Sequence, residues 1–421
     1  MRKGARGLML TGGVAASLAM AACGTSNSAS SSSPSAADSA SSAPAAMASS
    51  PSATDSMSGS PMSSSMASSG APMASSGAPM TSSAAAVGGV VGGGASIGKV
   101  GILLPDTQSS NRWVTSDPIA LKADCAKYKL TCYIQNAQNS PATMITQAQS
   151  MMNNGVKVLL VTPLDAASAD KIESAAKAKG IITIDYDRLA AGGSASLYVS
   201  FDNVKVGQVQ GQALTQCAAV KGVKAVDYVD VNGAPTDNNA TLFKQGYDSV
   251  LSKAAGWVKK DDQSIALWNN QTAGVTFASM LQAHPTIKAV MVANDGMATA
   301  VITDLAKQKL NGKVAVSGQD ATVQGLDSIL KGDQCFTIYK PSTDEADPAI
   351  AAAADFIQGK APTTTQTIKD PTSGRVVPAK LATPIAITKA NINLPIASGY
   401  APKAQVCAGS FAALCTAAGV K

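Results

Sequence analysis

One recurring pattern constrains this chain most: a short apolar segment is followed at once by polar, hydrogen-bonding side chains. Residues 181–184 lead into Asp187 and Arg188, and residues 287–293 lead into Asn294. Apolar runs of about four to eight residues between amphipathic helices are typical of buried parallel strands in an α/β sheet. Ligands of such sheets bind outside the carboxyl ends of the strands. The pattern therefore predicts one polar cleft built from several strand ends.

Strands and helices alternate from residue 99 onward in two successive units. The first unit has expected strands at 100–104, 131–134, 158–162, 181–185 and 197–201, and expected helices at about 117–129, 141–154 and 166–179. Asp202 is expected to open a helix that runs to about residue 220. The second unit has expected strands at 225–229, 287–292, 314–316 and 336–339, a weaker candidate at 265–267, a helix at about 343–358 and a last strand at 381–387. Two α/β units of similar size predict two lobes, which we place at 98–202 plus 341–378 and at 203–340 plus 379–421.

The start of the chain has the pattern of an export signal. Residues 1–22 combine a basic beginning with apolar stretches, and they are too short and too rich in glycine for a stable transmembrane helix. They end in Met20, two alanines and Cys23, which resembles a bacterial lipobox in which the cysteine becomes lipidated. A non-lipidated signal cut nearby is the alternative, since lipoboxes prefer leucine where Met20 stands. We expect export and lipid anchoring to the outer face of the cytoplasmic membrane.

Residues 23–97 form a low-complexity segment of Ser, Ala, Met, Pro and Gly with almost no charge. Residues 67–73 are repeated directly as residues 74–80. The segment has too little branched or aromatic surface to bury, so we expect a disordered, lipid-anchored linker. Its methionines could suit Cu(I), but no His or Cys accompanies them, and a tether is the favoured interpretation.

Six cysteines remain in addition to Cys23, and an even number in an exported chain favours disulfides. Six cysteines allow fifteen connectivities. Short separations favour Cys125–Cys132 and Cys407–Cys415, which would leave Cys217 for Cys335. None of the six has the spacing and histidine partners of a zinc site, and the one histidine, His284, lies in an expected surface turn. We expect no metal and no cofactor.

Two classes of function have little support. The formal net charge of +6 comes without a basic run, which argues against nucleic-acid binding. A single histidine and the absence of a Gly-x-Ser-x-Gly motif argue against hydrolase chemistry. Asp187 could suggest a glycosidase carboxylate, but the adjacent Arg188 should lower its pKa and suit binding instead of proton donation. We expect no enzymatic activity.

Side chains suited to a polyhydroxylated ring stand at successive strand ends. Asp and Asn pair with vicinal hydroxyls, Arg and Lys donate to hydroxyl and ring oxygens, and Trp covers a C–H face. The set comprises Arg112, Trp113, Asp187, Arg188, Asp237, Asn239, Trp268, Asn294, Asp320 and Lys340. Any one of them alone would be more typical of a turn or a helix cap. Together they predict a sugar-binding cleft.

Several motifs resemble the D-xylose-binding branch of the type I bacterial sugar-binding proteins. They are SSNRW at 109–113, YDR at 186–188, YVSFDN at 198–203, TDNN at 236–239, LF at 242–243, ANDG at 293–296, SGQDA at 317–321 and YKP at 339–341. The similarity extends in order over roughly residues 98–400. It implies two Rossmann-like lobes joined by three crossover segments, and capture of a monosaccharide, D-xylose or a related aldose, for delivery to an ABC permease. It also implies a monomer.

The resemblance implies that Trp113 and Trp268 stack on the two faces of the ring. It implies that the other eight residues of the set contact hydroxyl and ring oxygens. The chain departs from the family between Val100 and Arg112, where one residue is added and Pro105 replaces a polar residue. Trp257 is expected to serve packing. Alternatives are a receptor that presents the sugar-bound form to a membrane kinase and, less favoured, a carbohydrate-active enzyme.

Overall fold

The computed structural model describes residues 89–91, 95–364 and 366–421 of the chain. The expected signal peptide at 1–22, Cys23 and most of the expected linker lie outside the described residues. Within the described part, no helix combines the length and the apolar character that crossing a membrane requires.

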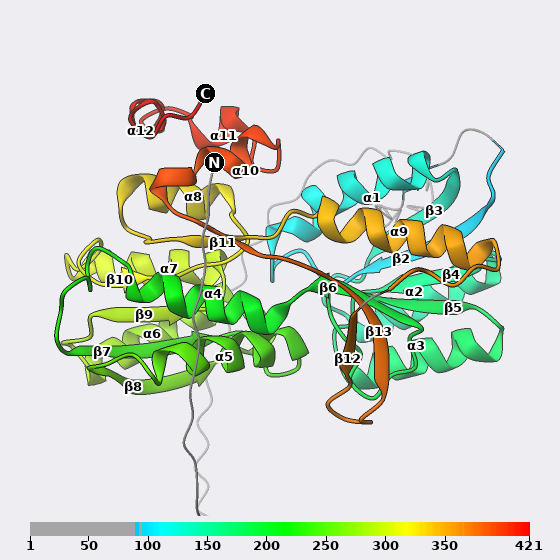
Figure 1. The fold of residues 1–421 in the computed structure, drawn as a ribbon, viewed down its shortest axis with the longest axis horizontal. Helices are drawn as coiled ribbons and strands as arrows, with labels where there is room; N and C mark the ends of the chain where they lie inside the picture. The colour runs from blue at the N-terminus through cyan, green and yellow to red at the C-terminus, as the bar shows by residue number, and fades with distance from the viewer. Residues whose placement is uncertain (1–88, 92–94, 365) are drawn as a thin grey trace, which may run out of the picture. The chain divides into compact units, whose positions relative to one another are not determined.

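An eight-stranded sheet forms the first lobe (Figure 1). Its five central strands and β13 run parallel, and an antiparallel strand closes each edge. In spatial order the strands are β1 (Gly89–Val91), β3 (Leu130–Asn136), β2 (Gly98–Leu104), β4 (Val158–Val161), β5 (Ile182–Tyr186), β6 (Leu197–Phe201), β13 (Val376–Ala382) and β12 (Gln366–Lys369).

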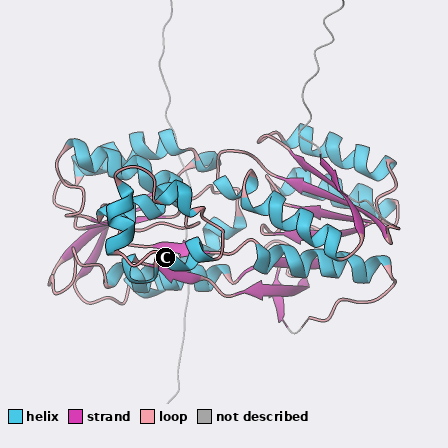
Figure 2. Ribbon diagram, turned by 90° about the horizontal axis from the view of Figure 1, so that it is seen from above, coloured by secondary structure: helices cyan, strands magenta, loops and turns pink. Residues whose placement is uncertain are grey.

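Helices cover both faces of this sheet, as Figures 1 and 2 show. They are α1 (Ser116–Lys127) and α9 (Thr343–Ile357) on one face, and α2 (Pro141–Asn153) and α3 (Ala166–Ala178) on the other. Alternate residues of a strand enter opposite cores: Ile102 packs with α1 and α9, whereas Leu103 packs with α2 and α3. Burial on both sides explains why these strands are continuous apolar runs.

A four-stranded parallel sheet forms the core of the second lobe. Its spatial order is β10 (Ala315–Val316), β9 (Ala289–Val292), β7 (Val226–Asn232) and β8 (Trp257–Ser264). Its helices are α4 (Asn203–Thr215), α5 (Asn238–Leu251), α6 (Asn270–Ala283), α7 (Asp295–Lys307) and α8 (Val323–Lys331). Helices α4 and α5 touch backbone to backbone, because a Cβ at Gly207 would lie 2.0 Å from the carbonyl oxygen of Phe243.

The second lobe differs from the sequence-based expectation in two strands. Residues 257–264, which were not expected to form a strand, make the edge strand β8 that begins at Trp257. The strand is mostly exposed and charged, as edge strands often are, so it lacks the apolar run that marks a buried strand. The expected strand at 265–267 is wrong, because η2 (Ala266–Trp268) is a 3-10 turn there.

Two further strands pair outside the main sheet of this lobe. β11 (Thr337–Tyr339) pairs antiparallel with β14 (Ile385–Ile387) in a separate two-stranded sheet. The single strand expected at 381–387 is therefore divided between β13 and β14, since Pro384 lacks the N–H that a continuous ladder needs. The expected boundary between residues 378 and 379 falls inside β13, which pairs with β6 as far as Ala382.

The last part of the chain packs on α8. It contains η3 (Lys389–Asn391), α10 (Asn393–Ala397), α11 (Lys403–Val406) and α12 (Phe411–Ala417). Ile396 and Val406 share a buried core with Leu326 and Leu330 of α8. We call residues 389–421 the C-terminal extension.

Three segments connect the two lobes: β6 to α4, β11 to α9, and β13 to β14. Two of them lie together, because the N–H of Asp202 donates to the carbonyl of Ala382 at 2.9 Å. Asp202 also caps α4 by accepting from the N–H of Lys205 at 3.0 Å, as the sequence predicts. The predicted fold, two α/β lobes with three crossover segments, is confirmed.

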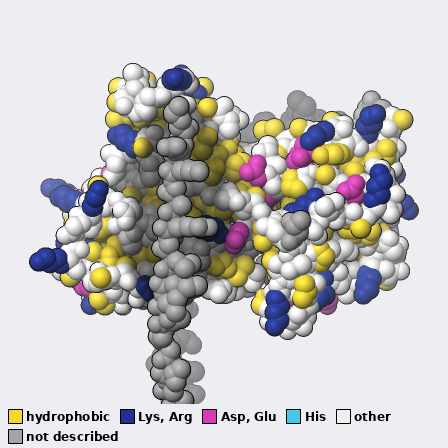
Figure 3. Space-filling model, viewed as in Figure 1, with side chains coloured by type: hydrophobic (Ala, Val, Ile, Leu, Met, Phe, Trp, Pro, Cys, Tyr) yellow, Lys and Arg dark blue, Asp and Glu magenta, His cyan; other side chains and the backbone are white. Residues whose placement is uncertain are grey.

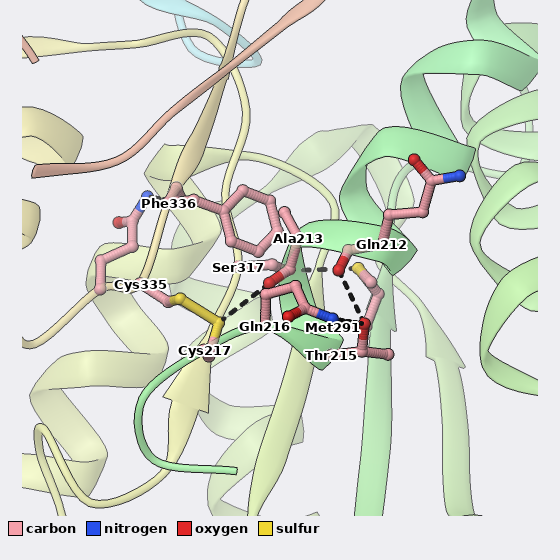
Figure 4. The surroundings of a disulfide bond; sticks show 10 residues. Gln212, Ala213, Thr215, Gln216, Cys217, Met291, Ser317, Cys335 and Phe336 are labelled. Atoms are coloured by element: carbon pink, nitrogen blue, oxygen red, sulfur yellow. Dashed lines mark hydrogen bonds between the residues drawn. A yellow bond between two sulfur atoms is a disulfide. The ribbon is translucent and has the colours of Figure 1, made fainter. Parts of the chain in front are cut away.

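The six cysteines form three disulfides, the two that short spacing favours and the one that then remains. Cys125 bonds to Cys132, Cys217 to Cys335, and Cys407 to Cys415. The second joins the chain just after α4 to the residues just before β11, and Phe336 lies beside it (Figure 4). It therefore links the carboxyl end of α4 to the start of β11 within the second lobe.

We expect the Cys217–Cys335 bond to stabilise the fold more than the two local bonds. It spans 118 residues, whereas Cys125–Cys132 spans 7. Loop-closure entropy then gives about 5 kcal/mol for the long loop and about 2.5 kcal/mol for the short one. Urea unfolding of the Cys217→Ser, Cys335→Ser variant, with Cys125→Ser, Cys132→Ser as the matched control, measures the difference. Equal losses in free energy of unfolding would contradict the expectation.

Candidate functional site

All ten residues of the predicted set line one cavity of about 30 Å³. Residues from both lobes and from the crossing after β11 contribute to its wall. Four residues that were not in the set also line it: Ser109, Ser110, Phe243 and Gln319. Each of these four stands inside one of the short motifs singled out in the sequence, and that position was the sequence signal that could have identified them.

The ends of parallel strands place most of these side chains. Asp187 and Arg188 follow β5, Asn294 follows β9, and Lys340 follows β11. Asn294 is at the same time the N-cap of α7, because its Oδ1 accepts from the N–H of Met297 at 2.9 Å. A strand-end residue can thus cap a helix and face a cavity at once, so the two interpretations of such residues do not compete.

Arg112 is the centre of a buried ion-pair network. Its Nε and Nη2 each donate to one carboxylate oxygen of Asp117 at 2.7 Å, and its Nη1 donates to Asp187 at 2.7 Å. Nη2 also donates to Glu345 of α9. Burial acts against the charge of Arg112, but these carboxylates raise its pKa well above the usual value. Most of its donors are therefore directed at protein carboxylates.

Asp187 joins this network to the second lobe. Its Oδ2 lies 2.7 Å from Arg112 and 3.9 Å from the Nζ of Lys340. Asn239, at the start of α5, donates to the carbonyl of Asp187 at 2.9 Å and to its Oδ1 at 3.2 Å. Burial works to raise the pKa of Asp187, but Arg112, Lys340 and Arg188 outweigh it and hold that pKa below the usual value.

Arg188 and Trp268 both reach Asp237 from different sides. The Nε of Arg188 lies 2.9 Å from the Oδ2 of Asp237, and the indole N–H of Trp268 donates to the same oxygen at 3.2 Å. Burial raises the pKa of Asp237, and the charge of Arg188 opposes that rise. A Cβ at Gly233 would lie 2.1 Å from the Cη2 of Trp268, so only glycine admits the indole in this position.

Trp113 lies among cations on the first lobe. The Cζ of Arg112 is 4.6 Å from the ring centroid of Trp113, and the Cζ of Arg188 is 5.7 Å from it. Its indole N–H donates to the Oγ of Ser109 at 3.2 Å. Two guanidinium groups and a hydroxyl therefore fix the orientation of this aromatic side chain.

Besides the bonds from Asn239 to Asp187, two further hydrogen bonds cross between the lobes at the cavity wall. The Nδ2 of Asn294 donates to the carbonyl of Ser109 at 2.8 Å, and the Oγ of Ser110 donates to the Oδ2 of Asp320 at 2.8 Å. All four residues line the cavity. The loop that follows β2 thus contacts strand ends of the second lobe, even though it is formed by the first lobe.

Lys340 and Gln319 keep hydrogen-bonding capacity that the described protein does not use. The Nζ of Lys340 lies 3.8 Å from Asp320 and 3.9 Å from Asp187, beyond hydrogen-bond distance, and 5.4 Å from the ring centroid of Phe243. The Oε1 of Gln319 is buried without a hydrogen-bond partner among the described residues. A buried polar atom without a partner is costly, so both groups suit a polar ligand in the cavity.

The Lys and Arg side chains on the face shown in Figure 3 are scattered. The described part of that face shows no continuous basic patch, which is the footprint expected of a nucleic-acid-binding surface.

Three carboxylates converge elsewhere in the second lobe, at Asp230, Asp248 and Asp262. The ammonium group of Lys259 lies 2.5 to 2.9 Å from one oxygen of each, and Lys244 also contacts the group. Two lysines thus already compensate the three negative charges. The group stabilises the α5–β8 edge and offers no open position for a cation.

A buried carboxyl pair adjoins the loop that carries Asp187. Asp185, in β5, and Glu173, in α3, are both fully buried, and each has one carboxyl oxygen without a partner among the described residues. Burial raises the pKa of Asp185 well above its usual value, and the neighbouring Glu173 carboxyl adds to the rise. Burial raises the pKa of Glu173 as well, against N–H donors at Ser194 and Ala195.

Comparison with known proteins identifies several sugar-binding relatives. The profile of the periplasmic binding protein domain matches residues 100–361. The D-xylose-binding periplasmic protein of Escherichia coli is 34% identical over 298 residues, which are 70% of this chain and 88% of that protein. The multiple sugar-binding periplasmic receptor of Rhizobium radiobacter is 29% identical over 74% of this chain and 92% of its own length.

Solved structures agree with these relatives. An ABC transporter solute-binding protein of Clostridium phytofermentans with bound β-D-glucose is 25% identical, with a TM-score of 0.67 over 73% of this chain and 99% of that protein. A carbohydrate transporter solute-binding protein of Chloroflexus aurantiacus in complex with D-glucose is 26% identical, with a TM-score of 0.65 over 73% of this chain and 97% of that protein. All four named relatives are binding proteins, in agreement with the expectation that the chain is not an enzyme.

We expect the buried carboxyl pair to make the fold less stable as pH rises. A raised pKa means that the folded state binds more protons than the unfolded state, so stability falls as pH rises from about 4 towards the raised values. Glu173→Gln removes one of the two charges and should raise the melting temperature at pH 8 by on the order of 2–4 °C, with a smaller gain at pH 4. Asp170→Asn, exposed on the same helix, is the control. A gain that is equal at both pH values would contradict this explanation.

Proposed function

Because the chain belongs to the periplasmic binding protein family, we propose that it captures a monosaccharide, D-xylose or a related aldose, between its two lobes and delivers it to an ABC permease. One observation carries the proposal: ten polar and aromatic side chains, singled out because they suit a sugar, surround one cavity. The identity to the D-xylose-binding relative supports the choice of an aldose.

The chemistry of the cavity wall suits vicinal hydroxyls. Three cations, from Arg112, Arg188 and Lys340, are balanced by three carboxylates at Asp187, Asp237 and Asp320. A neutral ligand that both donates and accepts hydrogen bonds can enter such a wall without adding net charge. In this proposal the amides of Asn239 and Asn294 add hydrogen bonds, and the indoles of Trp113 and Trp268 cover the C–H faces of the ring.

In this proposal Arg112 positions other side chains of the site, whereas the sequence suggested that it contacts the sugar directly. Its guanidinium is held by Asp117, Asp187 and Glu345, so it serves chiefly to orient Asp187 and Trp113. The donors that face the ligand most freely are those of Lys340.

Capture requires that the lobes move. A cavity of about 30 Å³ holds about two water molecules, which is less than a sugar ring needs. In our proposal the lobes, divided near residues 202, 340 and 382, separate to admit the ring, and they close with the hydrogen bonds from Asn294 to Ser109 and from Ser110 to Asp320. Closure would then present both lobes of a monomer to the permease in one fixed arrangement.

Export and anchoring complete the proposal. The relatives named as periplasmic are exported proteins, and residues 1–22 have the pattern of an export signal. We propose that Cys23 is lipidated and that residues 24–97 tether the binding lobes to the outer face of the cytoplasmic membrane. A tether lets the lobes reach the permease while keeping them close to it.

We expect loss of either cavity tryptophan to weaken binding of D-xylose about tenfold. Burial of a C–H face against indole contributes on the order of 1–2 kcal/mol, and 1.4 kcal/mol corresponds to a factor of ten. Isothermal titration calorimetry of Trp113→Ala and Trp268→Ala against a panel of aldoses measures the effect. Trp257→Ala, at the start of β8 and outside the cavity, is the matched control and should leave affinity unchanged.

Charged residues should matter more than the tryptophans. Asp320→Ala removes a charge-assisted acceptor and leaves sugar hydroxyls unpaired in a buried site, so we expect a loss greater than tenfold. Lys340→Met removes the freest cation of the wall and should have a similar effect. If these variants lose thermal stability while aldose affinity stays within about twofold of wild type, the residues only cap strand ends and the proposed function fails.

We expect Cys23→Ala to release the protein from the membrane. More than one acyl chain holds a bacterial lipoprotein firmly, and the substitution removes their attachment point. Cell fractionation and immunoblotting, with Cys407→Ser, Cys415→Ser as a control that keeps the lipobox, measure the distribution. A variant that stays with the membrane fraction would show that the anchor is not at Cys23.

A further inference from the structure

The backbone of Asp320 is in an unusual conformation. Its φ is 96°, and the φ of the next residue, Ala321, is 46°. Side-chain-bearing residues rarely occupy the left-handed region, and they remain there only where surrounding contacts impose it. The carboxylate of Asp320 lines the cavity and accepts from Ser110 of the other lobe. The position of this carboxylate therefore depends on whatever holds the strained backbone.

Three hydrogen bonds hold the backbone at Asp320. Its N–H donates to the carbonyl of Ile338 at 2.8 Å, and the N–H of Ala321 donates to the Oγ1 of Thr337 at 3.0 Å. The third comes from the C-terminal extension: the hydroxyl of Tyr400 donates to the carbonyl of Asp320 at 3.0 Å. Two of the three partners belong to β11, and only Tyr400 comes from outside the lobe's strands.

Tyr400 is itself held firmly. Its ring meets the ring of Tyr339 edge to face, with centroids 5.0 Å apart and an interplanar angle of 68°. The hydroxyl of Tyr339 in turn shares a hydrogen bond of 2.8 Å with Ser398. The next residue, Ala401, is buried, and its N–H donates to the carbonyl of Pro395 at 3.0 Å.

The rest of the extension anchors this segment to the lobe. Ala401, Val406 and Cys415 belong to the same buried cluster as Ala321 and Tyr339. The Nζ of Lys331 in α8 lies 4.7 Å from the ring centroid of Phe411, and the Cys407–Cys415 bond joins the end of α11 to α12. The C-terminal extension is thus a compact, cross-linked element, and it directs the hydroxyl of Tyr400 at the cavity residue Asp320.

We propose that Tyr400 is a positioning residue for the sugar site: the C-terminal extension uses its hydroxyl to hold Asp320 in the left-handed conformation that directs the carboxylate into the cavity. The inference rests on the proposed function only for its effect on sugar affinity. The hold on the Asp320 backbone can be tested without any ligand.

The first test measures hydrogen exchange by mass spectrometry in the ligand-free, full-length protein. Tyr400→Phe keeps the ring against Tyr339 and removes only the hydroxyl. We expect peptides that contain Asp320 and Ala321 to exchange several-fold faster in this variant. Tyr128→Phe is the matched control, because it removes a hydroxyl that donates to Asp347 at the same 3.0 Å in the other lobe, and it should leave that peptide unchanged.

The second test measures D-xylose affinity by calorimetry. One lost hydrogen bond is worth a factor of about five, so we expect Tyr400→Phe to raise Kd about fivefold and Tyr128→Phe to leave it unchanged. In an Asp320→Asn background the effect of Tyr400→Phe should shrink, because the carboxylate that it positions is gone. If Tyr400 has a purely structural role, Tyr400→Phe should lower the melting temperature of both the wild-type protein and the Asp320→Asn variant, and its effect on Kd should be the same in both.

The outcomes separate the two proposals. Unchanged exchange at Asp320 in Tyr400→Phe overturns the positioning role, whatever the sugar data show. Faster exchange together with an unchanged Kd, or with a Kd change that is additive to that of Asp320→Asn, also overturns it. If the wild-type protein binds no aldose, the proposed function fails, and the exchange experiment still decides whether Tyr400 holds Asp320.

Discussion

The site depends on the interactions of one buried carboxylate, that of Asp187. It accepts from Arg112 at 2.7 Å within the first lobe, lies 3.9 Å from Lys340 at a crossing, and accepts from Asn239 of the second lobe. A buried charge must have partners, because removing it from water costs several kcal/mol. The partners of Asp187 come from the first lobe, a crossing segment and the second lobe. The need to compensate this buried charge therefore favours the arrangement in which the three parts meet.

The same requirement explains the composition of the cavity wall. Arg112 is surrounded by Asp117, Asp187 and Glu345, and Arg188 pairs with Asp237. These side chains are held by one another, so they lose little further freedom when a ligand binds, and such preorganisation favours affinity. The groups left with free hydrogen-bonding capacity, the Nζ of Lys340 and the Oε1 of Gln319, are those that a polar ligand can satisfy.

Strain in the backbone is concentrated at the same place. Asp187, Trp268 and Asp320, which all line the cavity, have φ values of 62°, 55° and 96°. Such conformations are sparsely populated and remain only where neighbours impose them. At Asp320 the neighbours are β11 and the C-terminal extension, which explains why a segment remote from the cavity in sequence can influence it.

Local chemistry made much of this protein predictable from its sequence. Apolar runs marked the buried strands, Asp202 indicated the start of α4 through capping, and the polar residues after each run identified the cavity wall, because parallel strands bring their ends to one edge. The sequence did not reveal the exposed edge strand β8, because its charged residues give no apolar run, and it did not reveal that residues 381–387 are divided between two strands.

Only the tertiary structure decided which polar groups form hydrogen bonds and ion pairs with one another. Arg112 meets Glu345 across 233 residues, Ser109 meets Asn294 across 185, and Tyr400 reaches Asp320 across 80. Periodicity and capping act over a few residues, whereas these pairs follow from how two lobes and an extension pack, and no local pattern encodes that packing.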